Sequence, residues 1–537
     1  MQEIRIGFGQ INPVIGDFSH NAKEIRRQMT LAAESCDLLV FGELALCGYP
    51  LGDLSYRDDI IAATEHELTK LVEFSAAKEL ANLTVVLGHV AKAETQPRIQ
   101  SSYASAHNSA TVFRGGEIIG RYDKQRLPNY DVFDDWRNFV PGDKELIFDI
   151  AGKRAAVAIC EDIWEKDSKR PAAFRQAGVE LLIVPNGSPY NRVRKQSRRD
   201  AARAFQDGYA LAYSNLAGGQ DDLVFDGGSF LLDASGKEVF RAHSKPGLVL
   251  ESEPILPIVD NDPGDLFEAL VTGVRDYCDK TGQSKIVLGL SGGIDSALCC
   301  AIACEAIGAE NVLGVALPSR HSSDHSLADA EALAAAIGCE FRVEPINSAH
   351  DVLEEQLELE GLSAENVQSR IRAVILMAIS NQDARLLLTT GNKSELAVGY
   401  STIYGDSAGG FAPIKDVLKT DVWMLSRWYN QHKGEEIIPV SSIEKEPSAE
   451  LRPDQIDKDS LPDYEVLDHV LHLLLEKGAT VDEIEATGVE RALISEIDEK
   501  VRRAEWKRSQ GAIGPKTTTV SFGSGRRMPI TTRFGRL

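Results

Sequence analysis

A Ser-Gly-Gly loop between an expected strand and an expected helix constrains this chain more than any other feature. The apolar run IVL (286–288) predicts a buried strand, and GLSGGIDSAL (289–298) follows it directly. Gly292 and Gly293 permit a tight turn whose backbone N–H groups can face an anion, and the following helix adds its positive dipole end. The acidic Asp295 beside a phosphate requires a divalent cation between them. The loop therefore predicts a phosphate and metal site, with a tight structural turn as the alternative.

The loop lacks the Lys-Ser/Thr ending of a Walker A loop. It resembles instead the pyrophosphate loop of enzymes that split ATP into AMP and pyrophosphate to activate a carbonyl group. This resemblance implies that ATP contacts the whole loop, namely Gly289, Leu290, Ser291, Gly292, Gly293, Ile294, Asp295 and Ser296.

Length and charge limit the class of protein. A chain of 537 residues is too long for one compact core, so two or more domains are expected. The net charge of −23 argues against nucleic acid or an anionic membrane as the main partner, because both need a basic surface. We interpret the excess acid as a solvated surface. Phosphate ligands would then need local cationic groups or a bound metal.

The eight cysteines show no CxxC metal pattern, and three of them, Cys299, Cys300 and Cys304, fall in an apolar helix pattern typical of a core. The N-terminal sequence MQEIRIGFGQ lacks the layout of a signal peptide. Apolar runs stay well short of the roughly 20 residues that span a membrane. These features together predict a cytoplasmic protein without a membrane partner.

Short apolar strands alternate with amphipathic helices along the chain, which predicts an α/β protein. We expect a first domain over 1–253, a Pro-rich linker over 254–265 and a second domain over 266–537. The second domain should be a doubly wound parallel sheet with its nucleotide site at the carboxyl ends of the strands. Residues 441–465 read as a long functional loop or lid, and the last twenty-five residues as weakly ordered unless docked.

Three residues of the first domain stand at or near the ends of expected strands. Glu43 follows LLVF, Lys124 lies in YDKQRLPNY, and Cys160 ends the strand RAAVAI. A cysteine there can act as a nucleophile if a base takes its proton and a cation stabilises the thiolate and the later oxyanion. Taken singly, a solvated glutamate and a core cysteine are the more ordinary interpretations.

The runs FGELALCGYP, YDKQRLPNYDVF and AICEDIWE occur in the order of, and resemble, the Glu, Lys and Cys motifs of the nitrilase (carbon–nitrogen hydrolase) superfamily. The resemblance implies an α-β-β-α sandwich fold and the hydrolysis of amides or nitriles through a thioester or related acyl-enzyme. It makes Cys160 the nucleophile, Glu43 the general base and Lys124 the oxyanion stabiliser. Two positions depart from the pattern: Gly42 stands where the family usually has Pro, and Asp135 where Glu is common.

The second domain offers further polar residues after an expected strand, in LLLTTGNKSELAVGYSTIYGD (386–406). Thr390 offers a hydroxyl, and Glu395 with Asp295 could hold a magnesium ion that bridges phosphates. A solvated acid at a helix start is the alternative for Glu395. The expected helix ENVQSRIRAVILMAISN places Asn366 at a polar end that could contact a dinucleotide.

These runs, together with SAELRPDQIDKDSLPDYEVLD, resemble the ammonia-ligase domain of the NAD synthetase family. A nitrilase-type domain ahead of it points to the glutamine-dependent branch, and the resemblance covers essentially the whole chain. It implies that ATP adenylates the nicotinate carboxylate of deamido-NAD and that ammonia then displaces AMP to give NAD. The ammonia comes from glutamine at the first site, and a sheltered passage between the sites is a reasonable hypothesis.

The same resemblance assigns the remaining contacts. Glutamine is held by Tyr130, Ser188 and Arg194, with Lys195 as an alternative to Arg194. Thr390 and Lys419 contact ATP, and Asn366, Glu395 and Lys507 contact deamido-NAD. Asp295 and Glu395 bind Mg²⁺, with ATP as co-substrate. The resemblance also implies a homo-oligomer with the synthetase domains at a dimer core.

Other readings of the two halves stay open. One is a different amidotransferase of the pyrophosphate-loop group, such as one that makes GMP or asparagine, although TTGNKSE with STIYGD argues against it. Another is an amidase whose second half only senses nucleotide. A third is a binding module fused to a ligase that uses free ammonia.

Overall fold

The computed structural model describes residues 4–94, 104–165, 167–452 and 455–532. They form two compact units, one made of residues up to 220 with 224–260, and the other of 221–223 with 261 onward. Among the described residues, the helices are all too short or too polar to cross a membrane.

The first unit contains two six-stranded sheets. In spatial order one sheet consists of β14 (Gly247–Val249), β1 (Ile6–Gln10), β2 (Leu38–Phe41), β3 (Thr84–Lys92), β4 (Ala106–Arg114) and β5 (Glu117–Asp123). The other consists of β13 (Glu238–Arg241), β12 (Phe230–Leu232), β9 (Ala210–Asn215), β8 (Leu181–Asn186), β7 (Lys153–Val157) and β6 (Ile147–Ile150). Strands β1 to β3 run parallel, as do β7 to β9, and antiparallel strands flank both groups. A further hairpin joins β10 (Ala217–Gln220) and β11 (Leu223–Asp226).

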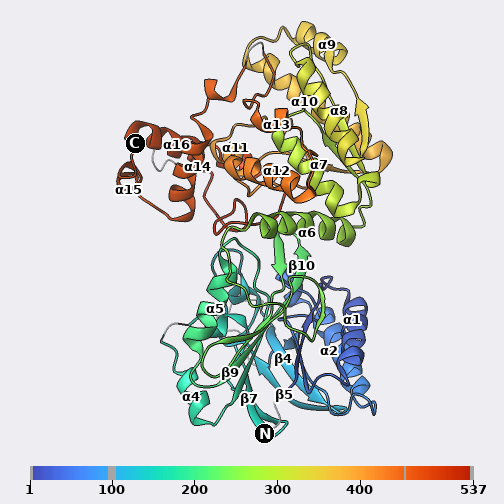
Figure 1. The fold of residues 1–537 in the computed structure, drawn as a ribbon, viewed down its shortest axis with the longest axis vertical. Coiled ribbons are helices and arrows are strands. Elements are labelled where there is room, and N and C mark those ends of the chain that lie inside the picture. The colour runs from blue at the N-terminus through green and yellow to red at the C-terminus, as the bar shows by residue number, and fades with distance from the viewer. Residues whose placement is uncertain (1–3, 95–103, 166, 453–454, 533–537) are drawn as a thin grey trace. The chain divides into compact units, whose positions relative to one another are not determined.

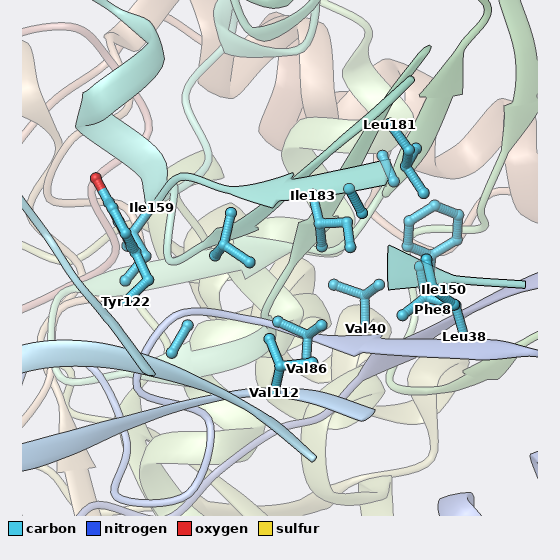
Figure 2. Packing of buried hydrophobic residues seen from close by; sticks show 14 of the residues in the cluster. Phe8, Leu38, Val40, Val86, Val112, Tyr122, Ile150, Ile159, Leu181 and Ile183 are labelled. Carbon is cyan, nitrogen blue, oxygen red and sulfur yellow. The ribbon is translucent and has the colours of Figure 1, made fainter. Parts of the chain in front are cut away.

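The two sheets pack face to face through apolar side chains. Val40 and Val86 of the first sheet point toward Leu181 and Ile183 of the second (Figure 2). Each fully buried side chain of this kind contributes roughly 1.5–3 kcal/mol to stability. The helices α1 (Phe18–Ala32) and α2 (Asp58–Phe74) cover the first sheet, and α4 (Arg170–Gln176) and α5 (Arg194–Phe205) cover the second (Figure 1). The predicted α-β-β-α sandwich is confirmed.

The sequences of β4 and β5 lack a clean apolar pattern, so a search for short apolar strands does not find them. Strand β4 reads AHNSATVFR, yet Asn108 and Ser109 are fully buried within it. Polar residues are buried where they have partners, and Asn108 finds one in Glu43, as described below. A pattern based on hydrophobicity cannot detect a strand whose buried face belongs to a polar site.

The second unit is built on a parallel sheet in the order β17 (Glu340–Val343), β16 (Val312–Ala316), β15 (Ile286–Gly289) and β18 (Leu386–Leu388). Helix α10 (Leu362–Asp383) packs Ile371 and Ile379 on one face. Helix α7 (Ile294–Ile307) packs on the sheet with α6 (Pro263–Thr281) and α12 (Lys419–Lys433) beside it. The predicted doubly wound sheet is confirmed, and its strand order reverses beside β15, where ligands bind in such folds.

The remaining helices surround this sheet or form a group of their own. They are α8 (Asp324–Ile337), α9 (Asn347–Leu357), α11 (Lys393–Val398), α13 (Val440–Glu444), α14 (Tyr464–Leu471), α15 (Val481–Glu485), α16 (Arg491–Arg503) and α17 (Glu505–Arg508). The expected loop over 441–465 thus begins within α13. Further along, Glu450 accepts hydrogen bonds from Lys445, Ser323 and Ser326.

The C-terminal segment docks on its own unit rather than staying loose. Lys516, Thr517 and Thr518 are buried, and the backbone N–H groups of Thr517 and Thr518 both donate to Asp416. Buried Lys393 donates to Thr518 Oγ1 at 2.6 Å and forms ion pairs with Asp416 and Glu476 at 3.0 and 3.1 Å. The segment is therefore docked, which is the exception that the expectation of weak order allowed, with its own unit as the surface. Residues 533–537 lie outside the described part of the chain.

We expect Lys393→Met to destabilise the protein by about 3–5 kcal/mol, because it leaves the carboxylates of Asp416 and Glu476 buried without their cation. Urea unfolding of the full chain measures this. Lys458→Met is the matched control, since Lys458 is exposed and pairs with surface acids, and it should change stability little. Equal effects of the two substitutions would contradict a stabilising role of the buried network.

Candidate active site

The predicted nucleophile Cys160 lies at a sharp turn beyond the carboxyl end of β7. It begins a single 3₁₀ turn (Cys160–Ile163) and is 5% exposed. Its φ of 43° is in the left-handed region, which costs a non-glycine residue of order 1 kcal/mol or more. Such strain is typical of a side chain that the fold presents at a functional site.

The structure brings the three predicted catalytic residues of the first unit together. Lys124 Nζ lies 2.5 Å from Glu43 Oε1 and 2.6 Å from Asp135 Oδ2. The side chains of Lys124, Glu43 and Asp135 are all buried. Asn108 Nδ2 and the N–H of Gly187 also donate to Glu43, at 2.7 and 2.9 Å. Several hydrogen bonds and ion pairs thus hold Glu43 and Lys124 in place.

Asp135, which departs from the family pattern, contacts the site directly. One of its oxygens accepts from Lys124 and the other from the Tyr49 hydroxyl at 3.1 Å. The shorter Asp side chain therefore reaches Lys124 from the start of α3 (Asp135–Asn138). Its position supplies the second carboxylate that a buried ammonium requires.

Electrostatics keeps Cys160 protonated at rest. Burial, the charge of Glu43 and a hydrogen bond to Glu43 raise the pKa of the Cys160 thiol well above its usual value, although Lys124 opposes this. Burial alone would lower the pKa of Lys124, but the charges of Asp135 and Glu43 outweigh it and raise that pKa. The thiol proton thus faces a carboxylate, and the ammonium stays charged.

Asp162 was not among the predicted site residues, although it lies two positions after the cysteine. Its fully buried carboxylate accepts from the N–H of Ile159 at 2.8 Å, just before Cys160. It also accepts from the N–H groups of Gln125 and Arg126 at 3.2 and 2.8 Å, just after Lys124. One carboxylate therefore joins the cysteine turn to the lysine segment. The run AICEDI does not show that this acid is buried, so the sequence offered no signal for this role.

Two of the three residues predicted to hold glutamine, Tyr130 and Arg194, contact the segment that follows Cys160. Tyr130 donates its hydroxyl to Glu161 at 2.8 Å, next to Cys160. The Arg194 guanidinium lies 5.4 Å from the centre of the Trp164 ring, and its buried Nε has no hydrogen-bond partner among the described residues. Ser188 is buried, and its hydroxyl accepts from Arg198 Nε at 3.0 Å. The backbone carbonyl of Lys195, the alternative to Arg194, accepts from Arg199.

In the second unit, the predicted anion loop joins β15 to α7. Gly289 ends the strand, buried Leu290 follows, and Ile294 begins the helix. Gly292 has a φ of 78°, and a Cβ there would lie 2.1 Å from the carbonyl oxygen of Ser326, so only glycine fits.

The two serines of this loop hold its shape. Ser296 Oγ donates to the carbonyl of Gly293 at 2.9 Å and lies 3.2 Å from Ser291 Oγ. Ser291 Oγ accepts from the N–H of Gly293 at 3.2 Å. The first N–H groups of α7 have no acceptor within the helix, so the loop can offer them to an anion.

Asp295 and Glu395 meet at one cation. Lys419 Nζ donates to Asp295, and it lies 3.3 Å from Glu395 Oε1. Asn392 also donates to Asp295 at 2.8 Å, and Tyr464 to Glu395 at 3.4 Å. Burial, only partly offset by Lys419, raises the pKa of Glu395 to about 8, and the charge of Asp295 adds to the rise.

This donor set fits a divalent cation. Two carboxylates that share one ammonium group can share a hard metal ion, and magnesium is usually bound by one or two carboxylates with water and phosphate oxygens. Burial and the charge of Asp295 both raise the pKa of Glu395, and a bound metal ion would oppose this by favouring the ionised carboxylate.

One of the other predicted nucleotide contacts follows the strand beside β15, and two contact the segment after Glu395. Thr390 follows β18, the parallel neighbour of β15. Asn366 of α10 accepts from the Thr402 hydroxyl at 2.8 Å. Lys507 of α17 donates to the carbonyl groups of Gly399 and Ser401 at 2.8 and 2.7 Å. Asn366 and Lys507 thus border one loop, 399–406, which follows the helix of Glu395.

Both halves of the chain match known families. Residues 5–250 match the family model for carbon-nitrogen hydrolase, and residues 266–511 match that for NAD synthase. A glutamine-dependent NAD(+) synthetase of Thermotoga maritima is 40% identical over 588 residues, covering 99% of each chain. One of Synechocystis is 42% identical, covering 98% of this chain and 99% of the relative.

A solved structure agrees with these sequence relatives. The glutamine-dependent NAD+ synthetase of Acinetobacter baumannii, in complex with ADP, matches with a TM-score of 0.76 and 34% identity. The match covers 99% of this chain and 98% of that one. By family, identity over the full length and fold, this chain belongs to the glutamine-dependent NAD(+) synthetases, which are ligases.

Proposed function

We propose that this protein converts deamido-NAD to NAD, with ATP as the activating co-substrate and glutamine as the nitrogen donor. The observation that carries the proposal is the presence of two complete polar centres on one chain. Cys160, Glu43 and Lys124 form the first, and Asp295 with Glu395 form the second around Lys419.

At the first centre, Glu43 takes the Cys160 proton as the sulfur attacks the side-chain amide carbon of glutamine. Lys124 is positioned to stabilise the oxyanion of the tetrahedral intermediate. The C–N bond then breaks, the nitrogen receives the proton from Glu43, and ammonia leaves with a thioester on Cys160. Water, deprotonated by Glu43, hydrolyses the thioester and releases glutamate.

Arg194 and Tyr130 are proposed to hold the amino-acid end of glutamine. The unpartnered Nε of Arg194 can donate to the glutamine α-carboxylate. The Tyr130 hydroxyl and the buried Ser188 are assigned as further contacts near the cysteine turn.

At the second centre, the nicotinate carboxylate attacks the α-phosphorus of ATP and pyrophosphate leaves. The Gly289–Ser296 loop and Thr390 hold the nucleotide, and Lys419 contacts its phosphates. Mg²⁺ held by Asp295 and Glu395 would neutralise charge on the leaving pyrophosphate. Ammonia then attacks the adenylated carbonyl, AMP leaves, and the carboxamide of NAD forms.

Asn366, Glu395 and Lys507 are proposed to contact deamido-NAD. Asn366 and Lys507 support this because they border loop 399–406. Glu395 supports it because the helix that carries it leads into that loop.

A homo-oligomer and a cytoplasmic location complete the proposal. Leu362 and Val374 of α10 are 71% and 69% exposed, and Leu357 and Val352 of α9, which contacts α10, are 56% and 60% exposed. These exposed apolar side chains support a contact between copies of this chain. All eight cysteines are free thiols, which suits a reducing compartment.

The primary test compares nitrogen donors in Cys160→Ala. We expect glutamine-driven NAD synthesis to fall to background and ammonium-driven synthesis to persist, because the two centres do separate chemistry. Formation of NAD, AMP and glutamate is followed together in the parent and the variant. Loss of ammonium-driven synthesis as well would refute the assignment of Cys160 to the glutamine site alone.

We expect Asp162→Asn to lower the glutamine-driven kcat on the order of 100-fold with little change in ammonium-driven synthesis. An amide cannot accept all the N–H donors that hold the cysteine turn against the Lys124 segment, and small displacements of reacting groups are costly. The exposed Asp149 provides the control, Asp149→Asn, which should retain parental activity. A change confined to KM would argue that Asp162 affects binding rather than the placement of Cys160.

Glu395 makes stability fall as the pH rises in the absence of metal. Its carboxyl has a pKa of about 8 in the folded chain and about 4.3 when unfolded, so unfolding releases a proton between these values. The free energy of unfolding should therefore fall by up to about 1.4 kcal/mol per pH unit from this group. Unfolding in EDTA should show a smaller slope for Glu395→Gln than for the parent, whereas Glu499→Gln, at an exposed position, should match the parent.

A further inference from the structure

A group of three thiols lies in the second unit, outside the residues assigned to catalysis. Cys300 and Cys304 are one turn apart on α7, and Cys339 lies between Gly338, which ends α8, and the start of β17. The three sulfur atoms lie within 4.8 Å of one another. Cys300 Sγ and Cys339 Sγ lie 3.8 Å apart. Two cysteines that are 39 residues apart in sequence thus place their sulfur atoms side by side.

The three thiols differ in their access to solvent. Cys300 is fully buried and Cys304 is 7% exposed, whereas Cys339 is partly exposed. A small reagent from solvent therefore meets Cys339 first. The buried thiols of Cys300 and Cys304 lie within 4.8 Å of the Cys339 sulfur.

The pKa values of the thiols also distinguish Cys339 from Cys300. Hydrogen bonds from the thiols of Cys300 and Cys304 lower the pKa of Cys339 well below its usual value. The hydrogen bonds of Cys300 to both neighbours, together with burial, raise the pKa of that thiol. These directions favour loss of the proton from the accessible sulfur of Cys339 rather than from Cys300. A low-pKa, accessible cysteine next to a second thiol is the arrangement of reversible thiol oxidation.

We propose that Cys339 and Cys300 form an oxidisable pair that a peroxide converts to a disulfide. The Cys339 thiolate attacks a peroxide oxygen, so an S–O bond forms, the O–O bond breaks, and water leaves after protonation. The Cys300 sulfur then attacks the resulting sulfenic acid. An S–S bond forms, the S–O bond breaks, and the Cys300 proton leaves with the oxygen as water. Two thiols lose two electrons, and one peroxide becomes two waters.

A disulfide between Cys300 and Cys339 would affect the proposed ATP site through helix α7. The sulfur atoms must approach from 3.8 Å to covalent distance, which pulls α7 toward Cys339. Cys300 lies five residues after Asp295 on the same helix, or about 7.5 Å along its axis. A shift of about 1 Å in a group that positions substrate can cost a large part of the rate. Oxidation should therefore lower ligase activity; this consequence rests on the proposed function, whereas the disulfide itself does not.

The test treats the full-length parent with hydrogen peroxide and measures NAD synthesis with ammonium as nitrogen donor, so that oxidation of Cys160 does not enter the readout. We expect a loss of activity on the order of tenfold, its recovery with dithiothreitol, and a disulfide between the peptides of Cys300 and Cys339 by mass spectrometry. Cys339→Ser and Cys300→Ser should resist the loss. Cys278→Ser, which removes a buried thiol on α6, should remain as sensitive as the parent.

Two further results decide the proposal if a variant folds poorly. In the untreated parent, iodoacetamide near neutral pH should label Cys339 before Cys278, whose pKa burial raises to about 11. Equal peroxide sensitivity of parent and Cys339→Ser, or no Cys300–Cys339 link in the inactivated parent, would overturn the proposal. Stoichiometric zinc in the reduced protein, lost in Cys339→Ser, would overturn it in favour of a thiolate metal site. A missing ligase activity before oxidation would reject the proposed function alone, because the link is read by mass.

Discussion

A buried ammonium group between two carboxylates is the interaction on which both proposed catalytic centres depend. Burying an isolated charge has a large desolvation penalty. The attraction between an ammonium group and two carboxylates offsets this penalty only when the geometry brings both carboxylates to the same cation. The described residues contain this arrangement at Lys124 between Glu43 and Asp135, at Lys419 between Asp295 and Glu395, and at Lys393 between Asp416 and Glu476. In each case the partners come from segments far apart in sequence, so the ion pairs also fix how those segments meet.

The surroundings decide what each lysine can do. Lys393 also donates to Thr518 and to the carbonyl of Val520, so its three hydrogens have more than enough acceptors and it acts as a structural tie. Among the described residues Lys124 and Lys419 each meet two carboxylates, which leaves donor capacity for a substrate oxygen. The same chemical unit thus stabilises the fold in one place and is available for electrostatic catalysis in two others.

Sequence patterns anticipated the parts of the sites that follow directly from regular structure. The ends of β2 and β7 could be recognised from apolar runs, which brought Glu43 and Cys160 into view, and the glycines after β15 marked the anion loop. The catalytic and binding roles of these residues stay predictions. Asp162 could not be recognised, because its partners include backbone N–H groups on another segment, which no sequence pattern specifies. Strand β4 could not be recognised for a related reason, since its buried face serves a polar centre.

The glycine at position 42 shows how closely the backbone is drawn around Glu43. A Cβ at that position would lie 2.9 Å from the carbonyl oxygen of Asn186 and 2.7 Å from the Leu216 side chain. That same carbonyl accepts from the N–H of Glu43 at 3.2 Å, and the next residue, Gly187, donates to the Glu43 carboxylate. A proline here would need β8 to move away and would weaken both contacts. Glycine at position 42 therefore lets β8 lie close enough for Asn186 and Gly187 to hold the proposed base, Glu43.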